Sequence, residues 1–157
     1  MTILRMLLIA LLMTICLAEP ATAQKSNDPT AWTYQAKRKF GNHFELFFQV
    51  KLKPGWHIYS LDPGGDESLI PPTFTFSDNK DVKLVGKVKE MTKPVTEKME
   101  GIDNPIRFFN GEAIFMQEVE VPWGQTVKIT GKHEYQVCND RMCLPPKTRG
   151  FSFIVKP

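Results

Sequence analysis

Three cysteines are the residues of this 157-residue sequence whose chemistry stands out first. Cys16 lies in an apolar amino-terminal run, whereas Cys138 and Cys143 lie near the carboxyl end, separated by Asn139–Met142. Two thiols at this spacing can form a disulfide, and a disulfide can exchange with the thiolate of another protein through a mixed-disulfide intermediate. The sequence therefore offers one closely spaced pair of sulfur atoms for redox chemistry.

The amino terminus predicts export. Arg5 is followed by an apolar run from Met6 to Ala18 and then by Ala21-Thr22-Ala23, the small residues that signal peptidase requires. We expect residues 1–23 to be a cleaved signal peptide and the mature protein not to be membrane-embedded, because the apolar run is shorter than the roughly 20 residues of a spanning helix. Cys16 then leaves with the signal peptide, and the other two cysteines remain in a compartment where disulfides persist.

A disulfide between Cys138 and Cys143 has two interpretations. It can be a structural staple, as most disulfides of exported proteins are, or it can be redox-active. A ring this small stabilises a fold by only about 2 kcal/mol, and exposed small-ring disulfides exchange more readily, so the redox interpretation is favoured. Arg141 could stabilise a nearby thiolate, and Asp140 would oppose it.

The rest of the chain predicts a single antiparallel β-sandwich over residues 32–157, after a flexible lead-in at residues 24–31. Short runs with period-2 alternation are separated by turn residues, which is typical of such sandwiches; a closed barrel is the alternative. The expected strands are 44–52, 56–60, 73–76, 82–88, 113–121, 126–137 and 151–155. Residues 61–72 are expected to form a loop, and a long connection is expected from Glu90 to about Asn110.

The last long strand leads into the cysteine pair. If its alternation continues, Cys138 falls on the polar face of that strand with Glu134 and Gln136, and its sulfur lies near solvent. The prolines at 145 and 146 remove two backbone donors, so the outgoing segment runs at an edge or leaves the sheet.

Composition and motifs exclude several other functions. The net charge is only +3 and no basic cluster alternates with aromatics, which excludes a nucleic-acid partner. No nucleophile and base are arranged as in a hydrolase. The two cysteines and two histidines could in principle bind zinc, but the cysteine spacing is wide and His133 lies on an apolar strand face. We therefore expect no metal and no other cofactor.

Several motifs occur in an order that resembles a known family. They are Gly55-Trp-His-Ile-Tyr59, Phe108-Phe-Asn-Gly-Glu-Ala-Ile-Phe115, Val119-Glu-Val-Pro122, Tyr135-Gln-Val-Cys138 and Cys143-Leu-Pro-Pro146. Together they look like the amino-terminal periplasmic domain of the thiol:disulfide interchange protein DsbD. The resemblance runs from about Phe44 to Val155, and the segment that carries the two cysteines is its most specific part.

This resemblance implies a periplasmic, immunoglobulin-like β-sandwich whose Cys138/Cys143 pair carries reducing equivalents. In the family, the donor is a thioredoxin-like domain, and the acceptors are periplasmic disulfide-bearing proteins. The resemblance also implies a cap loop whose aromatic tip shields the pair, which corresponds here to Phe108 followed by Phe109. The residues expected to flank the site are His57, Tyr59, Tyr135, Asp140, Arg141 and Pro145.

The sequence departs from the family in three respects. The family's ring is one residue longer, and Ile106 and Arg107 stand where family cap loops carry acidic residues. The family protein continues into a membrane domain and a thioredoxin-like domain beyond the position of Pro157, so we expect the donor to be a separate thioredoxin-like protein or membrane thiol transporter. If active, the chain would be a protein-disulfide reductase-like carrier; the alternative is a non-catalytic immunoglobulin-like adaptor with a structural disulfide.

Overall fold

The computed structural model describes residues 28–65, 68–98 and 104–157, and in these residues the regular structure consists of strands. The predicted signal peptide, residues 1–23, lies outside the described residues. The strands are β1 (Thr30–Phe40), β2 (His43–Leu52), β3 (His57–Gly64), β4 (Thr73–Phe76), β5 (Lys83–Glu90), β6 (Val95–Glu97), β7 (Ile106–Asn110), β8 (Glu112–Glu120), β9 (Val127–Tyr135), β10 (Val137–Cys138) and β11 (Lys147–Val155).

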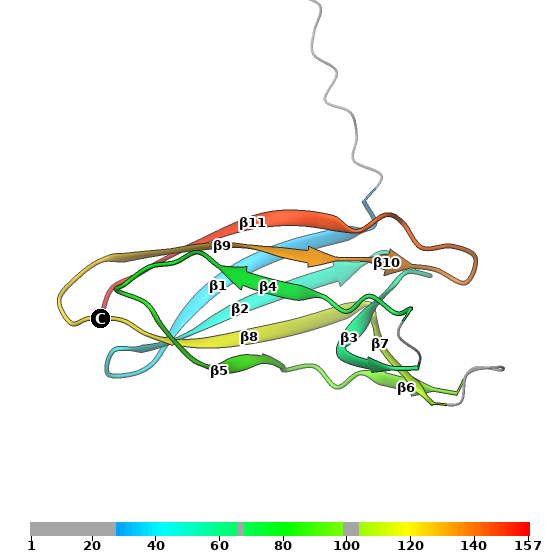
Figure 1. Cartoon of the computed structure of the whole chain (residues 1–157), viewed down its shortest axis with the longest axis horizontal. Coiled ribbons are helices and arrows are strands. Elements are labelled where there is room, and N and C mark those ends of the chain that lie inside the picture. The colour runs from blue at the N-terminus through cyan, green and yellow to red at the C-terminus, as the bar shows by residue number, and fades with distance from the viewer. Residues whose placement is uncertain (1–27, 66–67, 99–103) are drawn as a thin grey trace, which may run out of the picture.

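All strand pairs are antiparallel, and they form three sheets. The strand orders are β1-β2-β8-β5, β11-β9-β4 and β10-β3-β7-β6. The first two sheets lie over each other along the length of the molecule, and the third stands at the end where the β10 turn projects (Figure 1). The predicted antiparallel sandwich is confirmed.

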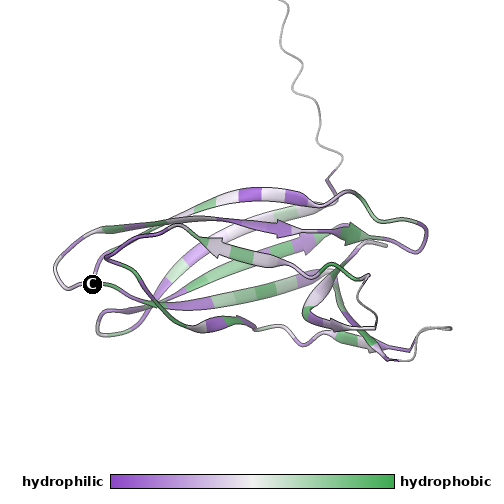
Figure 2. Ribbon diagram, in the orientation of Figure 1, coloured by the Kyte–Doolittle hydropathy of each residue, from purple (hydrophilic) through white to green (hydrophobic). Residues whose placement is uncertain are grey.

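The core between the two long sheets follows directly from the alternation of β2. Phe44, Leu46, Phe48, Val50 and Leu52 are all buried, whereas the residues between them are more exposed. Phe48 packs against aromatic rings from the opposite sheet, at 4.8 Å from Phe74 and 4.9 Å from Phe151. Bands of opposite hydropathy alternate along the strands in Figure 2, as expected for strands with one face in a core.

Several segments differ from the sequence predictions. β1, at Thr30–Phe40, was not among the expected strands and begins inside the predicted lead-in. β3 extends through Gly64 into the predicted loop, and β11 begins at Lys147 rather than at residue 151. The connection predicted over residues 90–110 contains β6 and β7. β6 and β7 have three and five residues. Strands this short exist because distant strands pair with them, and local periodicity carries little signal for such strands.

The start of β1 is fixed by a buried carboxylate. Asp28 accepts hydrogen bonds from the backbone N–H of Thr30 at 3.0 Å, the hydroxyl of Tyr135 at 2.7 Å and the guanidinium of Arg149 at 2.9 Å. Burial alone would raise the pKa of Asp28, but the hydrogen bonds from Arg149, Thr30 and Tyr135 outweigh it and hold this pKa well below its usual value. The described chain is therefore anchored from Asp28 onwards.

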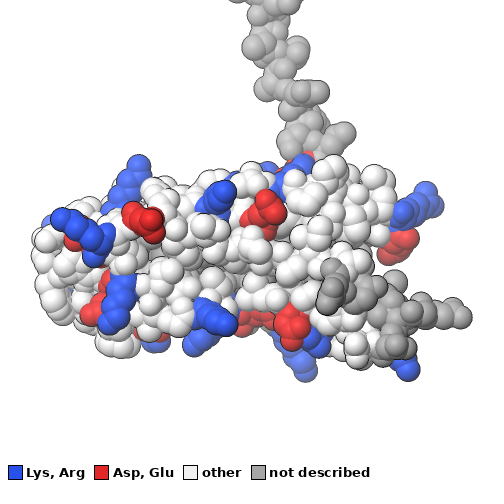
Figure 3. All heavy atoms as spheres, in the orientation of Figure 1, with Lys and Arg blue, Asp and Glu red and all other residues white. Residues whose placement is uncertain are grey.

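The visible surface carries basic and acidic side chains side by side rather than in one large patch of either sign (Figure 3). Among the described residues, no helix is long and apolar enough to cross a membrane.

Candidate functional site

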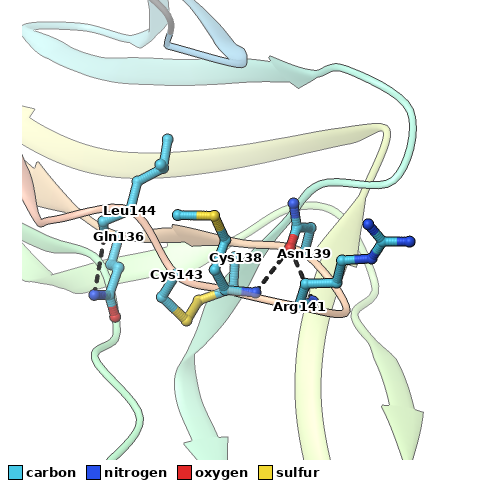
Figure 4. Close-up of a disulfide and its surroundings, with 7 residues drawn as sticks. Gln136, Cys138, Asn139, Arg141, Cys143 and Leu144 are labelled. Carbon is cyan, nitrogen blue, oxygen red and sulfur yellow. Dashed lines mark hydrogen bonds between the residues drawn. A yellow bond between two sulfur atoms is a disulfide. The ribbon is translucent and has the colours of Figure 1, made fainter.

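The two cysteines face each other across a tight hairpin at the end of the sandwich. Cys138 and Cys143 form an isolated antiparallel bridge with a Cα–Cα distance of 3.9 Å, and their sulfur atoms are joined in a disulfide (Figure 4). Hydrogen bonds flank the pair on both sides: Asn139 N–H donates to the Met142 carbonyl at 2.9 Å, and Leu144 N–H donates to the Val137 carbonyl at 2.9 Å. This is the pattern of a non-hydrogen-bonded pair, in which opposed side chains come closest together.

Asn139 shapes the turn between the cysteines. Its side-chain oxygen accepts hydrogen bonds from the backbone N–H groups of Arg141 and Met142, both at 2.9 Å. An asparagine that bonds to its own backbone two residues later favours a turn, so the residue type suits the position. Gln136 adds a hydrogen bond of 3.0 Å to the Leu144 carbonyl. The turn is thus fixed by bonds that do not involve sulfur.

The two cysteines differ in how far they are buried. Cys138 is 2% exposed, whereas Cys143 is an exposed residue. The prediction that Cys138 continues the polar face of its strand is therefore wrong. β9 ends at Tyr135, and after Gln136 the chain joins a different sheet, where Val137 and Cys138 are both buried against β3. The sulfur that a partner can approach belongs to Cys143.

A row of side chains crosses the third sheet next to the disulfide. Cys138 pairs with His57 on β3, and His57 pairs in turn with Asn110 on β7. Directly opposed residues of antiparallel strands point to the same face of the sheet, with Cβ atoms about 4.5–5.5 Å apart. His57, Cys138 and Cys143 therefore project from the same face.

A second row lies two residues away on the same face. Tyr59 pairs with Phe108, and Phe108 pairs with Val95 on β6. Tyr59, Phe108, Ile106 and Cys138 form a buried hydrophobic cluster separate from the main core. Phe108 is 8% exposed, and its ring centroid lies 5.1 Å from that of His57. This small cluster holds Cys138 in apolar surroundings.

Both rows border a cavity of about 430 Å³ that opens beside the disulfide. The cavity is lined by His57, Tyr59, Glu97, Ile106, Phe108, Cys138, Asn139, Asp140, Arg141, Met142 and Cys143. It contains both cysteines, a histidine and two carboxylates. In Figure 4 the Arg141 side chain extends away from the sulfur atoms.

His57 is the titratable ring in this cavity. Burial lowers its pKa below the ordinary 6.5, while the carboxylates of Asp140 and Glu97 act in the opposite direction. The ring is therefore neutral at pH 7, with two acidic groups placed to stabilise its protonated form. In the parts of the chain that the structure describes, there is no group of three or more His, Cys, Asp or Glu residues suited to holding a metal ion.

The sequence matches a family model described as "Thiol:disulfide interchange protein DsbD, N-terminal" over residues 24–154. The chain belongs to the DsbD N-terminal family. No curated protein resembles it closely enough to count as a match. Family membership together with the Cys138–Cys143 disulfide supports a role in thiol–disulfide exchange.

Two solved structures share the fold. The N-terminal periplasmic domain of ScsB from Proteus mirabilis is similar with a TM-score of 0.58 and 19% identity, covering 84% of this chain. The chain spans 48% of that ScsB domain. The N-terminal domain of DsbD from Neisseria meningitidis, in its reduced form, is similar with a TM-score of 0.52 and 12% identity, covering 81% of this chain and 87% of the other. The sandwich is thus immunoglobulin-like, as in these DsbD-type domains.

The structure brings most of the sequence-predicted site residues of this DsbD-type domain together. His57, Tyr59, Phe108, Asp140 and Arg141 line the cavity with the two cysteines. Three others lie elsewhere. Phe109 belongs to the main core and packs against Phe115 at 5.7 Å, Tyr135 is fully buried in that core, and Pro145 is exposed beyond the cavity.

Four cavity residues of the DsbD-type site were not predicted as site residues: Glu97, Ile106, Asn139 and Met142. Ile106 was noted only as a departure from the family's cap loop. Asn139 carried a usable signal, because asparagine between two closely spaced cysteines favours a turn. Glu97 had no such signal in the sequence, because its position near His57 depends on the pairing of β6 with β7.

Proposed function

We propose that this chain is a periplasmic thiol–disulfide exchange protein that carries reducing equivalents through Cys138 and Cys143. The observation that supports this best is the asymmetry of the disulfide, which joins an exposed cysteine to a buried one at the rim of a cavity. Only one sulfur is open to a partner, while the other is held ready to complete the exchange. A purely structural bridge needs no such division.

The electron transfer divides into two exchanges. A donor thiolate attacks the sulfur of Cys143; the Cys138–Cys143 bond breaks, and its electron pair stays on Cys138. A second donor thiol then attacks the mixed disulfide, which releases Cys143 as a thiolate and leaves the donor as a disulfide. The reduced pair passes both electrons to an acceptor disulfide by the same steps in reverse.

The donor in this proposal is a thioredoxin-like protein or a membrane thiol transporter, and the acceptors are periplasmic proteins with disulfides. Residues 1–23 act as the cleaved signal peptide, and residues 32–157 form the exchange domain. Similarity to a domain of ScsB that is described as periplasmic supports this location.

Phe108 serves as the shield of the buried cysteine, Cys138. Its ring packs in the same cluster as Cys138, and its strand is held on one side by Tyr59 and on the other by Val95. Because β6 pairs only with β7 within the described sheet, β6 can separate from this edge and uncover the Phe108 ring while β7 stays paired with β3. Phe109 stays in the main core in this proposal.

Trapping tests the proposed exchange. In Cys138→Ser the attacking sulfur of Cys143 remains but the resolving thiol is gone, so a mixed disulfide with a thioredoxin-like protein should accumulate on a non-reducing gel. Cys143→Ser leaves only the buried thiol and should trap far less. If neither variant forms an adduct, thiol exchange is not the function.

The reduction potential separates the carrier from an adaptor with an inert disulfide. The carrier requires a potential within reach of thioredoxin-like proteins, near −270 mV, whereas structural bridges generally lie below about −300 mV. Equilibration against glutathione or dithiothreitol redox buffers measures it. A potential far below that range would favour the adaptor.

A further inference from the structure

Resolution of a mixed disulfide on Cys143 requires Cys138 to lose its thiol proton. This step rests on the proposed exchange function. A thiolate is the nucleophile, and apolar surroundings favour the protonated thiol. Cys138 is 2% exposed and packs with Tyr59, Ile106 and Phe108, so water is poorly placed to take the proton. A base is needed on the protein side of the cavity.

His57 is the group that the fold places for this purpose. It is the direct cross-strand partner of Cys138, its side chain lies on the same face, and both residues line the cavity. Burial and the charges of Asp140 and Glu97 act on the pKa of its imidazole, with no contribution from a hydrogen bond to a described residue. The neighbouring rings of Tyr59 and Phe108, at 5.4 and 5.1 Å, restrict its position.

The charged groups around His57 suit a reversible proton acceptor. Asp140 from the turn and Glu97 from β6 both favour the protonated ring, and burial opposes them. Arg141 also lines the cavity, but its side chain extends away from the sulfur atoms (Figure 4). A base is most effective when it is neutral before the reaction and stabilised once it has taken the proton.

We propose that the His57 imidazole accepts the thiol proton of Cys138 as Cys138 attacks the mixed disulfide on Cys143. The Cys138–Cys143 bond forms, the bond from Cys143 to the acceptor breaks, and its electron pair leaves on the acceptor sulfur. That sulfur takes a proton from the imidazolium or from solvent. The two thiols of this domain are oxidised and the acceptor disulfide is reduced, and the reverse reaction returns the proton through the same ring.

Rapid acid quenching of the reduced protein mixed with glutathione disulfide tests this role. Mass spectrometry resolves the reduced protein, the glutathione adduct and the intramolecular disulfide, so the rate of adduct resolution is measured separately from adduct formation. His57→Gln should slow resolution by roughly 10²-fold at pH 7. The wild-type rate should level off by neutral pH, whereas the His57→Gln rate should keep rising into the alkaline range.

Two further variants separate proton transfer from structure. His57→Tyr keeps a ring in the strand and should show the same slow resolution and the same rise in rate at alkaline pH. In His57→Ala, added imidazole should accelerate resolution, whereas it should have no effect on the wild type. His43→Gln, at the partly buried ring paired with Glu118, is the control and should resolve normally. Resolution rates and pH profiles in both His57→Gln and His57→Tyr that equal the wild type would overturn the proposal. Glutathione disulfide needs no protein partner, so this outcome is distinct from failure of the trapping experiment above.

Discussion

The main core and the small cluster beside the disulfide differ in what surrounds their buried side chains. The main core gathers buried residues from both long sheets, and rings such as Phe48 and Phe115 are completely enclosed. The small cluster contains Tyr59, Ile106, Phe108 and Cys138 and borders an open cavity. Stability is therefore concentrated in the main core, while the chemistry lies where few contacts must be broken for a partner to enter.

Two of the three histidines, His133 and His57, differ in the same way. His133 is 1% exposed, bonds to the Tyr34 hydroxyl at 2.8 Å and stacks on Tyr135. His57 is half-buried and faces the cavity. Burial lowers the pKa of both, but only His57 has carboxylates that oppose the shift. One ring is kept neutral within the fold, and the other is placed where it can exchange a proton.

The largest effect is expected in the main core. Phe48→Ala removes a fully buried ring that contacts both sheets, so the free energy of unfolding should fall by about 3–5 kcal/mol. Urea denaturation measures it. Phe40→Ala, at a ring that is 57% exposed, is the control and should change stability by less than about 0.5 kcal/mol. Similar losses in the two variants would contradict the placement of the core.

The next effect is the pH dependence that His133 imposes on stability. Burial, with a smaller contribution from Arg149, lowers its pKa from 6.5 to about 4. Between these values the unfolded chain binds a proton that the folded protein does not. The free energy of unfolding should therefore fall by about 3 kcal/mol as pH drops through this window.

Glutamine has no titratable side chain. His133→Gln should therefore remove this dependence of the free energy of unfolding on pH, whatever its effect on stability at pH 7. Urea midpoints at pH 7, 5.5 and 4.5 for both proteins provide the comparison. An equal slope in the variant would show that other groups cause the loss.

The smallest effect on stability is expected in the small cluster. Phe108→Ala should cost less than about 2 kcal/mol, because the neighbouring cavity lets the site relax. In a Cys143→Ser background the same change should speed alkylation of Cys138 by iodoacetamide by roughly an order of magnitude. Ile154→Ala, at a side chain that is 70% exposed, serves as the control. Unchanged alkylation would mean that Phe108 does not shield the thiol.

The sequence predicted the parts of the fold that local alternation controls. The buried face of β2 and the strands β4 and β8 follow from period-2 patterns, and the cysteine pairing follows from cysteine count and export. Burial of Cys138 could not be predicted in the same way. It depends on the change of sheet at Gln136, which is set by the pairing of β10 with β3 more than seventy residues earlier in the chain.

The sequence likewise predicted only part of the site. Motif resemblance identified His57 and Tyr59 as neighbours of the disulfide, but not that His57 lies directly opposite Cys138. It grouped Phe109 with Phe108, although adjacent residues of a strand point to opposite faces and only Phe108 lies in the cysteine cluster. Strand registers decide both points, and a single sequence does not specify them.

The turn that joins the cysteines has a consequence for how the redox state is communicated. Backbone bonds on both sides of the pair and the three bonds made by the Asn139 and Gln136 side chains hold the hairpin without help from sulfur. We therefore expect the hairpin to keep its backbone conformation when the disulfide is reduced. A partner would then distinguish the oxidised from the reduced protein only by direct contact with the surface around the two cysteines.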